Sequence, residues 1–380
     1  MTMKEKSAFS KGPLLFQSLG KRGSIVVVVL WMLSILTIFT ISIGHYVRQK
    51  ITLADRIDVR SWLYGIAESG IHQAMMKLVE DEGSSGLDGL NDPWALDEKA
   101  FRDVKAGNGT FTVSYDVLDT DTGQKKTRYG VQDEESKLNL NMADPKIISR
   151  LLQIVAGIDD KKADEIAYSI ADWRDTDSSL SHPDYGAEDD YYEDLKVPYT
   201  TKNAPFEVLN ELLLVRGMTS EIFEKIKDKV TIYGGSGVNI NTASNEVLMA
   251  LGLDKTLIDK ILDYRKGTDR EEATKDDRAF SDATKIVTQL SDVKSISGGD
   301  QAAISNLVAQ GLLTVASNNF MIRSKGQLKE KGVEIDIVAV VDRKGKVLFW
   351  SAGIPKWTGH KGIAETDIAH DFVLDSKGSV

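Results

Sequence analysis

The chain has 380 residues, a formal net charge of −10 and no cysteine. The negative charge disfavours non-specific binding to nucleic acid, and the lack of cysteine excludes disulfides, zinc–thiolate sites and thiol nucleophiles. The length is sufficient for one or two hydrophobic cores, and a hydrophobic share of 42% is ordinary for a globular protein.

An apolar stretch near the N-terminus predicts a helix that spans a membrane. Residues 23–47 contain no Asp, Glu, Lys or Arg, and about 20 apolar residues cross a bilayer as a helix. The 23 residues at the N-terminus carry five Lys/Arg and one Glu, which predicts a cytoplasmic leader and an extracytoplasmic remainder. A plain single-pass anchor fits the same pattern. Because apolar residues continue at helical spacing, we expect one long helix over residues 24–80.

Alternating apolar and polar residues predict strands on both sides of a long helical region. Residues 111–117 and 127–132 form the first group, and residues 320–328, 333–342 and 346–352 form the second. We therefore predict an α+β fold. The long N-terminal helix, which we expect to be a transmembrane and pilin-like helix, packs on a small antiparallel sheet, and a large all-α insertion interrupts that sheet.

This fold predicts six parts along the chain. They are a leader peptide (1–23), the N-terminal hydrophobic helix (24–80), the first part of the sheet domain (81–132), the helical insertion (133–317), the second part of the sheet domain (318–364) and a flexible tail (365–380). We expect the tail to be flexible because its sequence is largely polar.

The insertion contains an internal repeat. Asn139-Leu140-Asn141-Met142-Ala143 recurs as Asn239-Ile240-Asn241-Thr242-Ala243, and each copy precedes two helices that end in an aromatic–Arg pair. We expect the asparagines to cap the helices that follow them and Gly157 and Gly252 to end those helices. Each unit resembles a helix-hairpin-helix (SAM-like) module, so tandem modules of this kind are expected.

Helix-hairpin-helix modules bind DNA when the hairpin amides hold a phosphate. Here the position often taken by a second glycine is Asp159 in one copy and Asp254 in the other, and a carboxylate repels phosphate. Between residues 131 and 320 we count 21 Lys/Arg and 34 Asp/Glu, whereas a phosphate-binding surface needs a basic face. A structural or protein-binding role is favoured, and a membrane-anchored, competence-type DNA receptor is the alternative.

Several segments together resemble the K-type minor pseudopilins of type II secretion systems. The resemblance covers roughly residues 21–352. It rests on the basic junction before the apolar stretch and on segments in the same order along the chain, which are Lys21-Arg22-Gly23, Tyr129-Gly130-Val131-Gln132-Asp133-Glu134-Glu135, Asp172-Trp173-Arg174-Asp175, Gly186-Ala187-Glu188-Asp189-Asp190, Lys202-Asn203-Ala204-Pro205-Phe206 and Glu211-Leu212-Leu213-Leu214-Val215-Arg216-Gly217-Met218.

The resemblance implies processing and a place in an assembly. Prepilin peptidase would cut between Gly23 and Ser24, and the new N-terminus would be methylated. Val28 would then stand at mature position five, where most pseudopilins carry a glutamate that pairs with a neighbouring subunit. Its absence implies a position at the pseudopilus tip. The implied partners are the I- and J-type minor pseudopilins, with the secretin and exported proteins as further candidates, and the implied location is the bacterial inner membrane with a periplasmic C-terminal domain.

An acidic loop is a candidate metal site. Residues 172–194 contain nine Asp/Glu and one Arg. A solvated loop is one interpretation; the other is a cation, because crowded carboxylates repel one another and Ca²⁺ accepts six to eight oxygens in a flexible geometry. No EF-hand spacing decides between them, whereas the K-type resemblance implies calcium in the helical domain. The expected ligands are Asp175, Asp177, Glu188, Asp189 and Asp190.

The sequence offers little support for catalysis. The five histidines are scattered, and the chain has no Gly-x-Ser-x-Gly motif, Walker loop or dinucleotide fingerprint. We therefore expect that the protein is not an enzyme.

Overall fold

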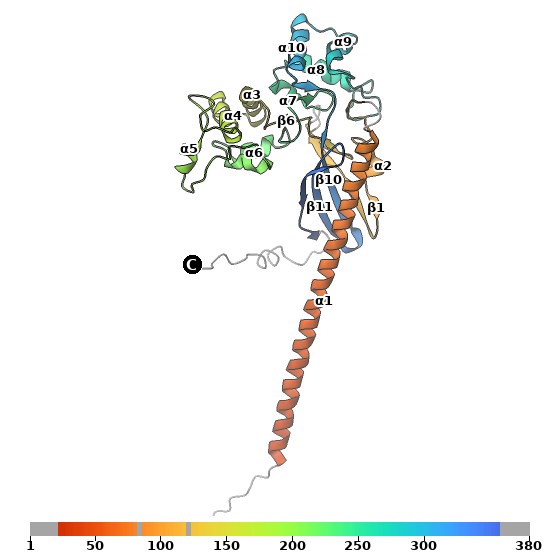
Figure 1. The fold of residues 1–380 in the computed structure, drawn as a ribbon. Coiled ribbons are helices and arrows are strands. Elements are labelled where there is room, and N and C mark those ends of the chain that lie inside the picture. Colours follow the sequence, from red (N-terminus) through yellow and green to blue (C-terminus); the bar gives the residue numbers. More distant parts are fainter. Residues whose placement is uncertain (1–21, 82–85, 119–122, 358–380) are drawn as a thin grey trace, which may run out of the picture. The chain divides into compact units, whose positions relative to one another are not determined.

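The computed structural model describes residues 22–81, 86–118 and 123–357 (Figure 1). The chain forms two units, Met1–Ser61 and Trp62–Val380, and the helix α1 (Arg22–Asp81) has residues in both. Residues 1–21 of the expected leader and the whole expected tail lie outside the described residues.

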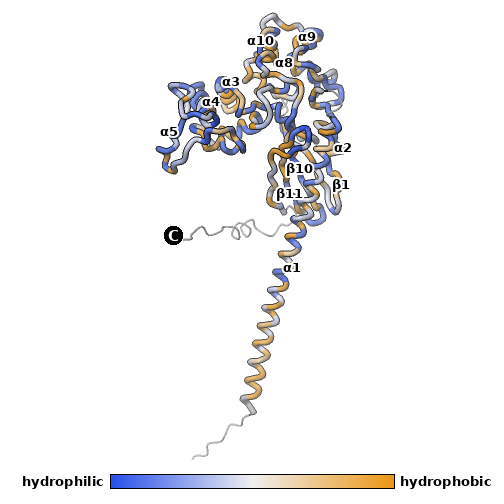
Figure 2. The backbone as a smooth tube through the Cα atoms, viewed as in Figure 1, coloured by the Kyte–Doolittle hydropathy of each residue, from blue (hydrophilic) through white to orange (hydrophobic). Residues whose placement is uncertain are grey.

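In the first unit, α1 is apolar over most of its length (Figure 2). From Ile25 to Asp81 it is long and apolar enough to cross a membrane. In the apolar part, the hydroxyl groups of Ser34, Thr37 and Thr40 each donate to the carbonyl four residues earlier. Such bonding suits a lipid environment, where no water satisfies a polar group. The predicted long apolar helix is confirmed.

In the second unit, the last five turns of α1 pack on the sheet. Leu63, Ala67 and Ile71 are fully buried, and their spacing places them on one face of the helix. Gly326 of the facing strand permits a close approach, since a Cβ atom there would lie 2.7 Å from the Leu63 carbonyl oxygen. Replacing this glycine by a larger residue would push the helix away from the sheet.

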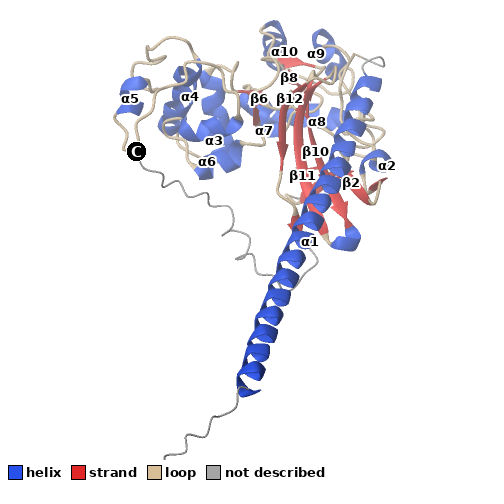
Figure 3. Ribbon diagram, turned by 60° about the horizontal axis from the view of Figure 1, so that its bottom comes forward, coloured by secondary structure: helices blue, strands red, loops and turns tan. Residues whose placement is uncertain are grey.

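The sheet is antiparallel, and its central pair is β10 and β11 (Figure 3). The strand order is β1-β2-β10-β11-β12, with β5 also paired to β10 and β13 also paired to β11. The strands are β1 (Val104–Ala106), β2 (Gly109–Val113), β5 (Gln132–Asp133), β10 (Asn319–Leu328), β11 (Val333–Asp342), β12 (Val347–Ala352) and β13 (Lys356–Trp357). The C-terminal meander predicted from residue alternation is confirmed.

The prediction of one strand over residues 111–117 is wrong. The strand breaks at Ser114, and a separate hairpin of β3 (Tyr115–Leu118) and β4 (Lys125–Arg128) follows. The reason lies on β10. Strand β2 pairs with β10 up to Ser324, whereas β5 pairs with β10 at Phe320 and Met321. Because β5 takes this part of the β10 edge, β3 turns away and forms its own hairpin.

The insertion lies between β5 and β10 and is mainly helical. Its helices are α3 (Pro145–Ala156), α4 (Asp160–Arg174), α5 (Asp189–Glu193), α6 (Ser220–Ile226), α7 (Asn245–Ala250), α8 (Lys255–Arg265), α9 (Ile286–Ser291) and α10 (Gly298–Ala309), with 3-10 turns at Leu209–Leu214 and Ala283–Lys285. Further short helical elements are α2 (Glu98–Phe101), before β1, and a 3-10 turn at Lys329–Lys331. Helix α3 contacts α4, α6 and α7, so one core runs through the insertion.

Each copy of the internal repeat is closed by a short parallel strand pair. In the first copy, β6 (Leu138–Asn139) pairs with β7 (Val230–Thr231). In the second copy, β8 (Val238–Asn239) pairs with β9 (Leu313–Thr314). The two copies therefore share a common plan, in which the start and the end of each unit lie side by side.

Candidate functional site

The asparagine motifs hold distant parts of their own repeat. The Asn141 side chain accepts from the Phe206 amide at 2.8 Å and donates to the Phe206 carbonyl at 3.0 Å. The Asn241 side chain makes the same two bonds with Phe280, at 2.7 and 3.0 Å. The expectation that these asparagines cap helices is therefore wrong. The N-cap positions of α3 and α7 belong to Asp144 and Ser244.

The expected roles of Gly157 and Gly252 at the helix ends agree better with the structure. Gly157 adopts a left-handed conformation (φ +69°) and caps the C-terminus of α3. Gly252 also has a positive φ, of +97°, one residue after the C-cap of α7. At the hairpins, the side chains of Asp159 and Asp254 each cap the next helix by accepting a backbone N–H at 3.0 Å. Their carboxylates thus occupy the amides that a DNA-binding hairpin would offer to phosphate.

The arginine of each aromatic–Arg pair bonds to the backbone of its own repeat. Arg174 donates to the carbonyls of Leu140 and Ala143. Arg265 donates in the same way to Ile240 and Ala243. Because each arginine satisfies carbonyl groups at the turn that follows the asparagine motif, these side chains support the repeat and do not reach outward.

A buried polar cluster lies where the insertion leaves the sheet. Asp133, at the end of β5, accepts from the hydroxyls of Thr242 and Ser317 at 2.5 and 2.8 Å. It also accepts from the Asn239 side-chain amide at 3.1 Å and from the Glu135 backbone at 2.8 Å. Burial, and then the Glu135 carboxylate, raise the pKa of Asp133 to about 7. One carboxyl group therefore joins the entry strand β5, the second repeat and the segment that leads into β10.

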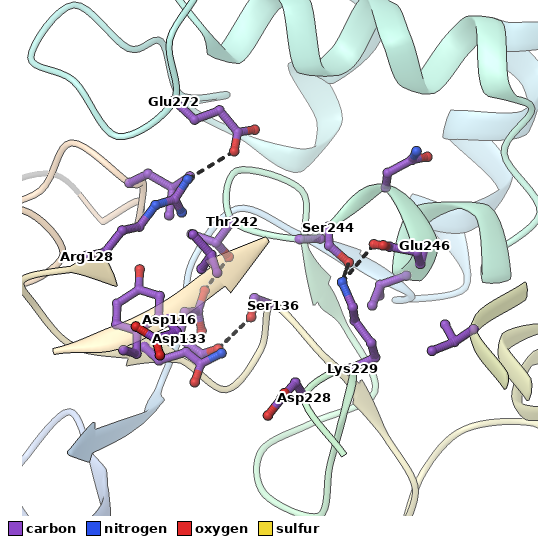
Figure 4. Close-up of a pocket in the computed structure, with 18 of the residues that line it drawn as sticks. Asp116, Arg128, Asp133, Ser136, Asp228, Lys229, Thr242, Ser244, Glu246 and Glu272 are labelled. Carbon is purple, nitrogen blue, oxygen red and sulfur yellow. Dashed lines mark hydrogen bonds and ion pairs between the residues drawn. The ribbon is translucent and has the colours of Figure 1, made fainter. Parts of the chain in front are cut away.

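A cavity of about 580 Å³ lies next to this cluster, between the β3–β4 hairpin and the two repeats (Figure 4). Several of its charged side chains form ion pairs. Arg128 of β4 contacts Glu272 at 3.1 Å, and Arg265 contacts the same glutamate at 3.4 Å. On the other side, Lys229 contacts Glu246 at 2.8 Å. The Arg128–Glu272 pair connects the hairpin to the insertion, and the Lys229–Glu246 pair connects the two repeats, so the cavity is best understood as a structural junction.

The predicted metal ligands are only partly brought together. Asp175, Asp177 and Glu188 each place a carboxylate oxygen within 4.8 Å of the other two. In this group, Asp175 Oδ1 and Glu188 Oε1 are buried and accept no hydrogen bond. A buried acceptor without a partner costs free energy, and a hard cation between these oxygens would remove that cost.

Burial and crowding of these carboxylates also raise their pKa values. Burial, and then the carboxylates of Asp172 and Asp175, raise the pKa of Glu188 to about 7. Burial, and then Asp177, also raise the pKa of Asp175. Crowded and partly buried carboxylates favour the charge-neutral form, and either a proton or a cation can supply the positive charge.

The other two predicted ligands lie apart from this group. Asp189 accepts from the Thr201 amide at 2.8 Å and from the Thr201 hydroxyl, and these bonds lower its pKa. Asp190 is exposed on the first turn of α5. A five-residue ligand set therefore does not form in the described structure.

Sequence reasoning missed the residue that shapes this loop. Asp172 is fully buried and accepts from the amides of Ser181 and Ala187, each at 2.8 Å. Gly186 has φ +100°, and a Cβ atom there would collide with the Asp172 carboxylate. The signal was present in the sequence as an acid at the end of a helix with a glycine fourteen residues later, but it does not stand out among nine acids.

A second carboxylate group was not predicted. Asp81, Asp88 and Asp92 also approach within 4.8 Å of one another. Here a cation is already present in the chain, because Arg343 contacts Asp81 at 3.4 Å and also contacts Asp88. This arrangement fastens the end of α1 to the turn after β11.

The residues expected to matter for processing all lie in α1. Gly23 and Ser24 fall in its first turn, and Val28 is 54% exposed. Their expected roles concern the chain in a membrane and stay predictions.

The chain was compared with known proteins. Residues 120–235 match the family of type II secretion system protein K. Type II secretion system protein K of Aeromonas hydrophila is 37% identical over 107 residues, which are 27% of this chain and 32% of that protein. A putative type II secretion system protein K of Escherichia coli strain K12 is 33% identical over 97 residues, 26% and 29% of the two chains. The matches thus span about a third of the length of these curated relatives, and the resemblance to protein K is confirmed.

The fold has a counterpart among solved structures. A chain from the crystal structure of the GspK–GspI–GspJ complex of enterotoxigenic Escherichia coli aligns with a TM-score of 0.60 and 20% identity. The alignment covers 80% of this chain and 99% of that chain. It extends the likeness from the matched segment to most of the fold.

Proposed function

We propose that this chain is a K-type minor pseudopilin, which supports pseudopilus assembly and protein export by type II secretion. The observation that carries the proposal is the protein K match over residues 120–235. It falls across the junction between the sheet and the insertion, in a chain whose α1 is long and apolar enough to cross a membrane. A pseudopilin needs both parts, because its helix packs with neighbouring helices while its globular part decides its place in the filament.

We place the protein in the bacterial inner membrane, with α1 as the anchor and the second unit in the periplasm. The basic leader supports this orientation. Prepilin peptidase would cut between Gly23 and Ser24 on the cytoplasmic side. The partners would be the I- and J-type pseudopilins, since the structural relative was solved in a complex with GspI and GspJ. The secretin and the exported proteins are further candidates for contacts at the tip.

The helical insertion would act as a cap. Its two copies are tandem helix-hairpin-helix-like modules in this proposal, and they serve structure in place of DNA binding. Two observations support this role. The asparagine and arginine side chains of each copy bond to the backbone of their own unit, and aspartates occupy the hairpin amides. We expect no catalytic activity.

The proposal also includes a structural Ca²⁺ ion in the acidic loop. Asp175, Asp177 and Glu188 would provide ligands, because their carboxylates converge and because Asp175 Oδ1 and Glu188 Oε1 lack hydrogen-bond donors. Calcium suits them because it binds oxygen ligands in a flexible geometry. Asp189 and Asp190 would join only if the first turn of α5 moved.

Processing is tested by the intact mass of protein extracted from membranes, with and without prepilin peptidase in the host. We expect the mass of residues 24–380, with or without one methyl group, only when the peptidase is present. An uncut chain in both hosts would contradict a pseudopilin. A strain that lacks its own protein K should also regain secretion when it receives this gene together with its matching secretion genes.

The tip position is tested by Val28→Glu. If the missing charge fixes this subunit at the tip, the variant should become able to take a place below another subunit and should lower secretion. Val28→Leu is the matched control and should behave as the wild type. Normal secretion by Val28→Glu, with the subunit still absent from positions below the tip, would show that another feature fixes its place.

A further inference from the structure

A group of apolar side chains is exposed on the first repeat, on and after α5 and on the 3-10 turn that precedes α6. Val197 is 77% exposed, Leu214 46%, Leu213 41% and Tyr191 37%. We call these four residues the leucine patch. Single exposed apolar residues are common on protein surfaces, whereas a group of them with a polar rim marks an interaction site.

Contacts within the repeat join the parts of the leucine patch. The Tyr199 hydroxyl donates to the Leu214 carbonyl at 2.7 Å, and Val197 stands two residues before Tyr199. The Tyr192 ring lies 5.2 Å from the ring of Tyr191 and 5.2 Å from that of Tyr199. The patch is therefore a preformed surface, and a partner does not have to order it on binding.

The rim of the patch is acidic. Residues 189–199 contain four Asp/Glu and one Lys. Three of these acids are exposed and form no ion pair with another described residue; they are Asp190, Glu193 and Asp194. The nearby Arg216 does not neutralise them, because it pairs with Glu165 at 2.8 Å. The charge of the rim therefore favours a partner with Lys or Arg beside its apolar residue.

The position of the patch limits what can occupy it. Helix α5 lies at the end of the insertion that is farther from the sheet (Figures 1 and 3). A neighbouring subunit that packs along α1 and the sheet lies at the other end. A second copy of this chain would bring two acidic rims together, which is unfavourable, and the same charges are repelled by an anionic membrane surface.

We propose that the leucine patch binds exported proteins, through segments in which an apolar residue stands beside Lys or Arg. This inference rests on the proposed function, because it assumes a subunit at the pseudopilus tip. Four side chains form a surface much smaller than the roughly 1,200–2,000 Å² that stable complexes bury. A small surface suits this partner, since an exported protein has to be released, whereas a permanent neighbour needs a larger contact.

The experiment places a photo-crosslinking amino acid in the full chain, in place of Leu214 or, as the control, in place of Val293. Val293 belongs to the second repeat and is 49% exposed, close to the value for Leu214. The chain is produced with its matching secretion genes in cells that lack their own protein K, and mass spectrometry identifies the crosslinked proteins. We expect proteins that are also found in the medium to be crosslinked at least about fivefold more at Leu214 than at Val293.

Two variants test the chemistry of the contact. Leu213→Ser/Leu214→Ser removes the apolar side chains, and Asp190→Asn/Glu193→Gln/Asp194→Asn removes the charge of the rim. Each should lower the secretion of the crosslinked proteins by about fivefold, with an unchanged amount of this chain in the membrane. Val293→Ser is the control and should secrete as the wild type does.

Two results would overturn the proposal. One is a set of crosslinks at Leu214 without exported proteins, whether it contains the secretin, another pseudopilin or nothing. The other is normal secretion by both patch variants. Failure of the proposed function is distinguishable from these results, because the wild-type chain itself would then not restore secretion.

Discussion

Asp133 and Asn239 are joined by a hydrogen bond of 3.1 Å, although 106 residues separate them. Asp133 ends the strand from which the insertion departs, and Asn239 begins the second repeat. The bond shows how the sheet holds the insertion. The contact is made by the second repeat and not by the first one. The first repeat therefore lies between Asp133 and Asn239, two points of the chain that are bonded to each other.

The first prediction concerns this contact. Asp133→Ala removes the carboxylate that accepts from the hydroxyls of Thr242 and Ser317, and each buried unsatisfied group is costly. The Asn239 amide loses one of its three acceptors and keeps the Asp88 carbonyl and the Ser317 hydroxyl. We expect the free energy of unfolding to fall by about 2–4 kcal/mol. Denaturant unfolding followed by tryptophan fluorescence measures it, because Trp94 is fully buried against Phe320.

The matched control is Asp116→Ala on the β3–β4 hairpin. Asp116 also bonds to a threonine hydroxyl, that of Thr127, but this pair is exposed. The change should stay within about 0.5 kcal/mol. If both variants lose the same stability, the burial of Asp133 is not what matters.

The second prediction concerns pH. The Asp133 pKa is raised from 3.8 to about 7 in the folded chain. Between these values the folded chain holds more protons than the unfolded chain, so the free energy of unfolding falls as the pH rises through this window. Asp133→Asn removes that titration. Over this window we expect a shallower decline in the variant than in the wild type, by up to roughly 1 kcal/mol per pH unit; parallel curves would contradict it.

The third prediction concerns calcium. Added Ca²⁺ should raise the melting temperature of the wild type, and a chelator should reverse the effect. Glu188→Gln and Asp175→Asn should each abolish most of the increase, because they remove a charged ligand. Asp190→Asn is the control and should retain it, since Asp190 lies outside the converging group. If Ca²⁺ does not change the melting temperature of the wild type, the acidic loop is a solvated loop without a structural ion.

The fourth prediction compares the two repeats. Asn141→Asp and Asn241→Asp each remove the amide donor that bonds to the carbonyl of Phe206 or Phe280. They also introduce a charge into a polar but enclosed position. We expect each variant to lose about 1–3 kcal/mol of unfolding free energy, with Asn241→Asp the more damaging, because Asn241 is fully enclosed and Asn141 is partly exposed. The reverse order would mean that the repeats are not held by equivalent contacts.

The sequence predicted what depends on local spacing. The 3.6-residue pattern in α1, the alternation in β10 and β11, and the recurrence of the asparagine motif are each visible within a short window. The role of the asparagines was not visible, because Asn141 bonds to a residue 65 positions away and Asn241 to one 39 positions away. Local capping was the nearest explanation, and the tertiary contacts replaced it.

The candidate metal site shows a related limit. The composition of the loop indicated an excess of carboxylates, but it did not show which of them lie close enough together to bind one ion. Glu188 and Asp189 are neighbours in sequence, yet the Glu188 carboxylate lies with those of Asp175 and Asp177, whereas Asp189 accepts from the backbone amide of Thr201. That division follows from the start of α5 at Asp189, a boundary that an acidic stretch does not reveal.

The pairing of Asp133 with Phe320 has a wider consequence. Strands β5 and β10 meet as the two arms of an antiparallel hairpin, and residues 134–319 take the place of its turn. In this sheet, an entire domain therefore takes the place of a hairpin loop. Because the entropy cost of closing a loop rises only slowly with its length, the long insertion adds little to the cost of pairing β5 with β10. A chain in which a short turn joins Asp133 to Phe320 could retain the sheet and α1, and the insertion could evolve in size without disturbing the part that enters a filament.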